Sequence, residues 1–292
     1  MSSRFNSPLL PVGSLLLGML SFQFGAALAK QLFPVMGAQG AAAIRLGLGA
    51  VILWLLRKPW RRLAGRQDWT SLVGYGVTIG VMNLCFYMAL RTIPLGIAVA
   101  LDFLGPLAIA VIGSRRALDF VWVALAVVGL ALLLPYPGQT QALDPVGVLY
   151  ALTAAVGWAA YILLGRRAGA AFGSDAVALG SAVGALVAVP VGIAHAGAAL
   201  FSPATLPFAI GVAVLSSALP YSLEMYALTR LPARTVGILF SGEPAIGALL
   251  GLMFLNEHLS AFQWLAIAAI IAASVGTVLG ARQAPVEIAE MA

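Results

Sequence analysis

The chain is dominated by apolar stretches that are each about as long as a bilayer is thick. An α-helix needs about 20 apolar residues to cross the hydrocarbon core. Helices satisfy their own backbone hydrogen bonds in lipid, whereas open strands do not. The sequence therefore predicts an all-α membrane protein with ten transmembrane helices. These helices are expected at residues 9–29, 38–56, 69–90, 94–113, 118–134, 146–165, 175–195, 205–228, 233–254 and 261–280.

The composition agrees with this class and excludes others. Hydrophobic residues make up 62% of the 292 residues and charged residues only 9%, and the mean hydropathy is +1.01. Soluble domains carry about 25% charged residues. A disulfide scaffold is excluded because Cys85 is the only cysteine and has no partner within the chain. We expect a lipid bilayer around the chain.

The basic residues predict how the chain is oriented. All of them except Lys30, Arg45 and Arg91 lie before the first apolar stretch, after the last one, or in every second joint between stretches. Cytoplasmic loops are enriched in Lys and Arg, so we expect both termini in the cytoplasm. The net charge of +6 then reflects topology. A DNA-binding segment at 57–66 is the weaker alternative, and we expect no nucleic-acid partner.

The first apolar stretch has some features of a secretory signal peptide. Arg4 precedes it, and Ala27-Leu28-Ala29 has the small residues of a cleavage site. The stretch is longer than the usual signal core, and further apolar stretches follow at once. We therefore expect the first helix to be retained as a transmembrane span.

The two halves of the chain carry a weak internal repeat. Leu90–Pro94 resembles Leu228–Pro232, and Pro106 and Pro244 each follow 12 residues after the last residue of these segments. Five spans per half is an odd number, so the second half enters the membrane with opposite polarity. Inverted repeats of this kind are typical of secondary transporters. Chance similarity in a chain rich in Leu and Ala is the alternative. The expected units are a first five-helix repeat at 9–134, a second at 146–280 and a cytoplasmic tail at 281–292.

Four ionisable residues fall inside the expected spans: Arg45, Asp102, Glu224 and Glu243. A charge at the bilayer centre costs at least about 2.5–3.5 kcal/mol, so such residues usually face a cavity and a partner. We expect Arg45 and Asp102 to be functional, with an internal salt bridge or a neutral carboxyl as the alternative. For Glu243 the alternative is that it holds a helix break at Pro244. For Glu224 the alternative is that its side chain reaches the cytoplasmic interface.

Three prolines are expected to interrupt these helices. A proline cannot donate a hydrogen bond to the carbonyl four residues earlier. Pro106 thus frees the carbonyl of Asp102, and Pro220 frees that of Ser216. Pro244 acts in the same way beside Glu243. Each freed carbonyl is expected to create a polar notch, although a kink that serves only packing is possible at each site.

Other polar and aromatic residues in the spans are weaker candidates for the lining of a cavity. They are Gln23, Asn83, Tyr87, Trp158, Tyr161 and Tyr221.

Sequence motifs for ATP binding, zinc proteolysis and a nucleophilic serine are absent. His195 and His258 do not have metal-ligand spacing. We therefore expect no cofactor, no metal and no enzymatic activity, and an intramembrane enzyme is a distant alternative.

Several segments are similar to those of one transporter family. The run Pro94–Pro106, followed by Ser114-Arg115-Arg116, is the most specific of them. Leu219–Glu224, Ala227–Arg234 and Glu243-Pro244 add to it. With its two five-span halves, the chain resembles the EamA type of the drug/metabolite transporter superfamily, and especially the bacterial threonine/homoserine exporters. The likeness extends from about Gly18 to Leu279. Family members typically carry Glu at the position of Asp102.

The resemblance implies a multi-pass protein of the bacterial inner membrane that exports small amino acids, driven by the proton gradient. An amino acid is a zwitterion, so its cavity should offer a cation and an anion. Arg45 can bind the carboxylate bidentately, and Asp102 can receive the ammonium. Carboxylates deprived of water bind protons more readily, so Asp102 and Glu243 are the expected proton-coupling residues. Export of another metabolite or of a lipophilic cation is the alternative.

Overall fold

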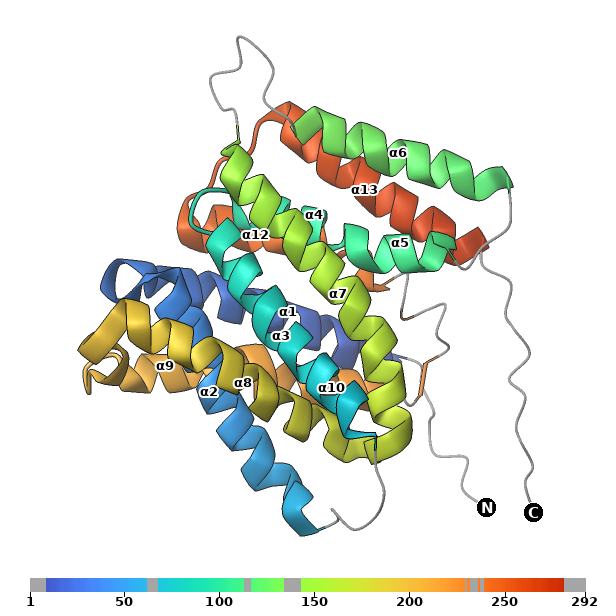
Figure 1. Cartoon of the computed structure of the whole chain (residues 1–292). Coiled ribbons are helices and arrows are strands. Elements are labelled where there is room, and N and C mark those ends of the chain that lie inside the picture. The colour runs from blue at the N-terminus through green and yellow to red at the C-terminus, as the bar shows by residue number, and fades with distance from the viewer. Residues whose placement is uncertain are drawn as a thin grey trace, which may run out of the picture.

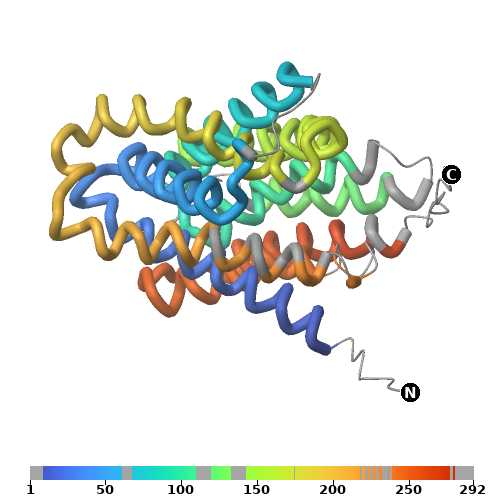
Figure 2. The backbone as a smooth tube through the Cα atoms, turned by 90° about the horizontal axis from the view of Figure 1, so that it is seen from below, coloured from blue at the N-terminus to red at the C-terminus, as the bar shows by residue number. Residues whose placement is uncertain are grey.

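The computed structural model describes residues 9–61, 68–112, 117–133, 143–228, 230–231, 236 and 239–280. All regular secondary structure in these ranges is helical (Figure 1), which confirms the all-α prediction. Within these described ranges, five helices are long and apolar enough to cross a membrane, and five further apolar helices are shorter. Most helices run roughly along one common direction (Figure 2).

Several helices lie close to the expected ranges, but one runs on to Phe172 past the expected end at 165, and another begins at Glu243 where a span was expected from 233. Short 3-10 turns and one π-helical turn, Val214–Ala218, occur between or beside them. The α-helices are α1 (Leu9–Gln31), α2 (Phe33–Arg57), α3 (Trp69–Ala89), α4 (Leu95–Asp102), α5 (Leu104–Ile112), α6 (Ala117–Leu133), α7 (Pro145–Phe172), α8 (Ala176–Ala196), α9 (Leu206–Ala213), α10 (Leu219–Leu228), α12 (Glu243–Leu255) and α13 (Ala261–Gly280).

Local sequence accounts for several helix ends. Asp68 caps α3 by accepting a hydrogen bond from the backbone N–H of Ser71 at 3.1 Å. Asp144 caps α7 in the same way through Val146 at 3.1 Å. Such caps satisfy backbone donors that have no partner within the helix. Gly37 has φ +69 and kinks α2 near its start. The regular part of α2 therefore begins after Gly37, where a span was expected.

Each half of the chain packs against the other half. α2 lies along α8, α6 along α13, and α4 along α12; α3 packs on α7, and α1 packs on α10. The pair of α6 and α13 forms one edge of the bundle, at the top of Figure 1. The joints α1–α2, α3–α4, α8–α9 and α12–α13 gather at one end of the bundle, on the left of Figure 1. We call this the Lys30 end.

Small residues bring α3 and α8 into close contact. A Cβ atom added to Gly80 of α3 would lie 2.8 Å from the carbonyl oxygen of Gly184 in α8. Gly76 meets Gly180 in the same way, with 2.7 Å from the added Cβ to the Gly180 carbonyl oxygen. Backbones in membranes approach closely where residues are small. Two pairs of glycines spaced four residues apart, Gly76 with Gly80 and Gly180 with Gly184, therefore face each other across the two helices.

The expected proline notches take three different forms. α4 ends at Asp102 and α5 begins at Leu104, so this span is divided directly after the carboxylate. The π turn interrupts the helix before Pro220. At Pro244 the expected interruption is present as the start of a new helix, because Ser241 and Gly242 form a turn and Pro244 lies in the first turn of α12. Proline is favoured there because the missing N–H would be unpaired in any case.

Candidate binding site

Arg45 of α2 is buried in the bundle with a side chain only 3% exposed. Its Nε donates to Ser216 Oγ at 2.8 Å, and its Nη2 donates to the Ser216 carbonyl oxygen at 3.2 Å. Its Nη1 donates to Asn83 Oδ1 at 2.6 Å. In the described part of the chain, no carboxylate lies within ion-pair distance of Arg45. Among the residues that the structure describes, the positive charge is therefore held by neutral oxygen atoms and is not balanced by an acid.

The side chains that accept from Arg45 are themselves held in place. The amide nitrogen of Asn83 donates to the Ile79 carbonyl at 2.9 Å, which directs the Oδ1 atom of Asn83 toward Arg45. Ser216 Oγ donates to the Val212 carbonyl at 2.6 Å, which leaves its lone pairs for the guanidinium. Both acceptors thus use the carbonyl of the preceding helical turn to fix their orientation. Binding groups fixed in this way lose little freedom when a ligand arrives.

The carbonyl of Ser216 is available to Arg45 because of the local helix geometry. Pro220 lacks the N–H that would bond to this carbonyl in a regular α-helix, and the π turn covers the same residues. π turns inside helices are frequent at functional sites. The notch expected at Pro220 thus provides one of the three hydrogen bonds of Arg45.

Two aromatic rings flank the guanidinium. Its Cζ lies 4.9 Å from the centroid of Phe22 in α1 and 5.5 Å from that of Tyr87 in α3. Aromatic faces attract cations, more strongly where water is excluded. The Tyr87 hydroxyl is buried and has no hydrogen-bond partner in the described part of the chain. A polar group in such a position is available to a ligand.

The guanidinium of Arg45 retains unused donors. Arginine carries five N–H groups, and the bonds to Asn83 and Ser216 use one on each nitrogen. One N–H therefore remains on each of the two terminal nitrogens. A guanidinium with two such donors can bind a carboxylate. The site is chemically suited to a small anion or to the carboxylate end of a zwitterion.

Asp102 lies at a second polar position in the bundle, at the break between α4 and α5. Its Oδ1 atom is buried and lacks a hydrogen-bond partner among the described residues. The next residue, Phe103, packs edge-to-face against Trp158 of α7, with 5.6 Å between ring centroids. Leaving a buried acceptor unpaired is costly. This carboxyl group is therefore ready to receive a donor.

Glu243 lies in a third group, at the start of α12. The amide nitrogen of Gln23 in α1 lies 3.5 Å from Glu243 Oε1, and both side chains are buried. The Oε1 atom of Gln23 has no hydrogen-bond partner in the described ranges. An acid in the first helical turn is favoured by the helix dipole. Gln23 follows Phe22 in α1, so this group and the Arg45 group take side chains from consecutive positions of one helix.

The structure brings some of the expected residues together and separates others. Arg45, Asn83 and Tyr87 form one cluster. Arg45 and Asp102 make no direct hydrogen bond or ion pair among the described residues. The sequence-based candidates that lie elsewhere are Tyr161, which stacks on Tyr75 with 5.0 Å between ring centroids, and Tyr221 and Glu224, which are on α10 with side chains outside the described part.

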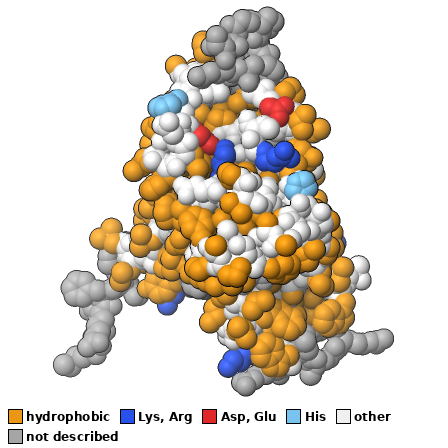
Figure 3. All heavy atoms as spheres, turned by 90° about the vertical axis from the view of Figure 1, so that its left-hand side faces the viewer, with side chains coloured by type: hydrophobic (Ala, Val, Ile, Leu, Met, Phe, Trp, Pro, Cys, Tyr) orange, Lys and Arg blue, Asp and Glu red, His pale blue; other side chains and the backbone are white. Residues whose placement is uncertain are grey.

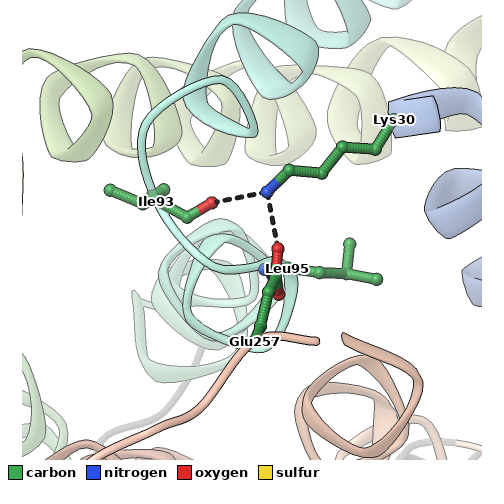
Figure 4. Close-up of polar contacts among 4 residues, drawn as sticks. All are labelled: Lys30, Ile93, Leu95 and Glu257. Carbon is green, nitrogen blue, oxygen red and sulfur yellow. Dashed lines mark hydrogen bonds and ion pairs between the residues drawn. The ribbon is translucent and has the colours of Figure 1, made fainter. Parts of the chain in front are cut away.

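One polar cluster was not expected from the sequence. Lys30 Nζ lies 2.6 Å from Glu257 Oε1 at the Lys30 end (Figure 4). Figure 3 shows this face of the molecule, where acidic, basic and histidine side chains gather mainly in the upper half. Glu257 follows Asn256 at the end of an apolar stretch. Lys30 and Arg91 are the two basic residues in the joints that are expected on the outer side of the membrane. Those two signals were the only ones in the sequence that pointed to this pair.

No metal site is evident in the part of the chain that the structure describes. Within it, no three His, Cys, Asp or Glu side chains gather closely enough to hold an ion.

Comparison with known proteins identifies the family. Residues 145–279 match the EamA-like transporter family. The threonine/homoserine exporter RhtA of Salmonella typhimurium (strain SL1344) is 52% identical over 276 residues, which cover 94% of each chain. The exporter of the same name from Escherichia coli (strain K12) is 52% identical over 274 residues, which cover 94% of this chain and 93% of that protein. The chain belongs to the EamA-like transporter family.

A solved structure supports the fold of this EamA-like chain. A structure titled "Crystal structure of protein" superposes with a TM-score of 0.60 and 20% sequence identity, covering 94% of this chain and 96% of that one. The similarity concerns the arrangement of the helices alone. Together with the long apolar helices, the family shows that this EamA-like chain is a multi-pass membrane protein.

Proposed function

We propose that this protein exports small amino acids, threonine and homoserine among them, in exchange for protons. The observation that carries the proposal is the buried guanidinium of Arg45, which has no acidic partner in the described part of the chain. A buried cation of this kind is costly unless an anion joins it. Relatives named for threonine and homoserine export are 52% identical to the chain, and those solutes carry a carboxylate.

We propose that the chain crosses the membrane ten times, as two inverted five-helix repeats. The contacts between helices support this arrangement. If each span is exchanged for the one five positions along, the contact of α3 with α7 becomes that of α10 with α1. The pairs α2–α8, α4–α12 and α6–α13 are exchanged into themselves. With both termini in the cytoplasm of a bacterium, the Lys30 end faces outward across the inner membrane.

In the proposed binding mode, the substrate lies between the three polar groups. Arg45 receives the carboxylate through the N–H groups that Asn83 and Ser216 leave free. Asp102 receives the ammonium, and Glu243 lies in the neighbouring group as a second acid. The other proposed lining residues are Asn83, Tyr87, Trp158, Tyr161, Tyr221 and Glu224.

The proposed coupling uses the same acids. Asp102 or Glu243 holds a proton when the cavity is empty of substrate and releases it when the substrate ammonium arrives. The two repeats then rock, so that the substrate leaves outside and a proton enters from that side. Alternating access around a central site between repeats is a general property of such folds. No enzymatic step and no cofactor take part.

A counterflow experiment tests the proposal. Proteoliposomes are loaded with unlabelled candidate solutes, and entry of radiolabelled threonine is measured for each one. We expect threonine and homoserine to stimulate entry, and decarboxylated analogues and lipophilic cations to have no effect. Stimulation by lipophilic cations, or by amines without a carboxylate, would contradict the role of Arg45.

A further inference from the structure

The ion pair at the Lys30 end joins several segments of the chain (Figure 4). Besides its contact with Glu257, Lys30 Nζ donates to the Ile93 carbonyl at 3.3 Å. The second carboxylate oxygen of Glu257 accepts the backbone N–H of Leu95 at 2.7 Å. The pair thus links the end of α1, the turn before α4, the first residue of α4 and the segment that follows α12.

These contacts give the pair more weight than an ordinary surface salt bridge. Exposed ion pairs contribute little because water screens them, but the two side chains here are only 21% and 13% exposed. The N-cap residue of α4, Pro94, makes no side-chain capping bond. Glu257 supplies that cap from a distant part of the chain, and a negative charge there favours the helix.

The chain around Glu257 is shaped to deliver the carboxylate. Asn256 ends α12 in the left-handed conformation, with φ +54. The backbone N–H of Glu257 then donates to the Gly251 carbonyl at 3.1 Å, so the chain folds back over the end of α12. A Cβ atom added to Gly251 would lie 2.5 Å from Glu257 Oε2. The absence of a side chain at Gly251 therefore makes room for this oxygen.

We propose that Lys30 and Glu257 are positioning residues that form the outer gate of the transport path. This inference rests on the proposed function, in which the Lys30 end faces outward. The pair holds the outer ends of α1, α4 and α12 together, and opening toward the outside requires it to break. α4 ends at Asp102 about 10 Å further in, at 1.5 Å per residue, and α12 begins with Glu243. The gate therefore grips the two helices that carry the central acids.

The native cysteine provides a reporter of opening. Cys85 of α3 is partly buried and lies about 6 Å from the outer end of that helix. Right-side-out vesicles are treated with a membrane-impermeant maleimide, and the rate of labelling of Cys85 is measured. Inverted vesicles report access from the cytoplasmic side, and Cys85→Ala gives the background. The measurement needs no substrate, so it is independent of which solute is carried.

Two variants should open the gate. Glu257→Gln removes the charge that holds Lys30, and we expect labelling from outside to rise about tenfold, as for the loss of a charged hydrogen bond. Gly251→Ala should act in the same way, because its methyl group displaces only the flexible end of Glu257. Gly211→Ala in α9 is the matched control, since an added Cβ atom there would meet no atom within 4 Å. It should leave the rate unchanged.

The sidedness of labelling distinguishes a gate from a merely stabilising contact. A gate predicts faster labelling from outside with no increase from the cytoplasmic side. Equal increases from both sides, or the same increase in Gly211→Ala, would indicate general loosening and overturn the proposal. Unchanged labelling in Glu257→Gln and Gly251→Ala would also overturn it. If labelling responds as expected while the counterflow panel fails, the gate stands and the assigned substrate is wrong.

Discussion

Arg45 shows how neutral groups can stabilise a buried charge. Two neutral side chains, Asn83 and Ser216, and two aromatic rings surround the guanidinium. They supply dipoles and electron-rich faces but no negative charge. Hydrogen bonds to charged groups contribute about 1.5–3 kcal/mol each, which offsets the cost of burial and still leaves the cation able to attract an anion.

Replacing this arginine by lysine tests the fork geometry. Arg45→Lys keeps the charge but loses the planar pair of donors that matches a carboxylate. Losing about one charged hydrogen bond to the substrate should raise the KM for threonine about 10- to 100-fold. KM is measured from initial rates of counterflow in proteoliposomes. An unchanged KM with unchanged preference for carboxylate-bearing solutes would remove Arg45 from the site.

Replacing Asp102 by asparagine tests proton coupling. Asp102→Asn keeps the size of the side chain but cannot release a proton. We expect proton-driven export to be abolished while folded protein is still recovered from the membrane. Transport driven by a pH difference is compared in wild type and variant, with gel filtration as the control for folding. Proton-coupled efflux that survives the change would show that the coupling residue lies elsewhere.

At the scale of the helices, glycine contacts explain how α3 and α8 lie so close. Gly80→Ala would place a methyl group 2.7 Å from Val187 Cβ. Overpacking of this kind costs about 1–3 kcal/mol, so we expect a lower unfolding temperature in detergent. Gly74→Ala in the same helix is the control, because its nearest contact would be an ordinary 3.5 Å to Leu164. Equal unfolding temperatures in Gly80→Ala and wild type would contradict the close packing.

The cap of α7 predicts a pH dependence. A hydrogen bond from the Thr92 side chain, and a second from the Val146 backbone, lower the pKa of Asp144 below its ordinary value of 3.8. Its charged form is thus favoured by folding, and this stability is lost as the pH falls through the lowered pKa. Asp144→Asn should be slightly less stable than wild type at neutral pH and equally stable in strong acid. Thermal unfolding of both proteins, measured from neutral pH to strong acid, checks this prediction. A stability difference between Asp144→Asn and wild type that widened in acid would contradict the assigned cause.

The sequence predicts helices well because their signal is local. Hydrophobic runs placed α3 and α13 to within one residue, at 69–90 and 261–280 expected against Trp69–Ala89 and Ala261–Gly280 observed. Pro244 was harder, since a proline is compatible both with a kinked helix and with the first turn of a new one. Only packing decides between the two.

Contacts across the whole molecule carry no such local signal. Arg45 could be recognised from its charge within a span, but Ser216 lies 171 residues away from it. Lys30 and Glu257 are separated by 227 residues, and each alone resembles an ordinary loop charge. Their pairing depends on how the two halves of the chain meet. The sequence thus predicted the individual candidates Arg45, Asn83 and Tyr87 but not their common contact.

At the scale of the whole molecule, both the proposed site and the gate depend on two halves that close around a polar interior. The polar groups at Arg45, Asp102 and Glu243 lie on different helices, so rocking of the halves would change their separation. In a bundle that binds no anion, a buried cation without an acidic partner in the described part would be costly. Movement of substrate against protons is the property that this arrangement is expected to produce.

The most direct measurement is the accumulation of radiolabelled threonine in proteoliposomes with and without an imposed pH difference. In an exchange of substrate for protons, threonine should concentrate in the more acidic compartment, whichever way the protein is inserted. We predict accumulation inside vesicles with an acidic lumen and its loss on adding a protonophore. Equal internal and external threonine under both conditions would contradict the account.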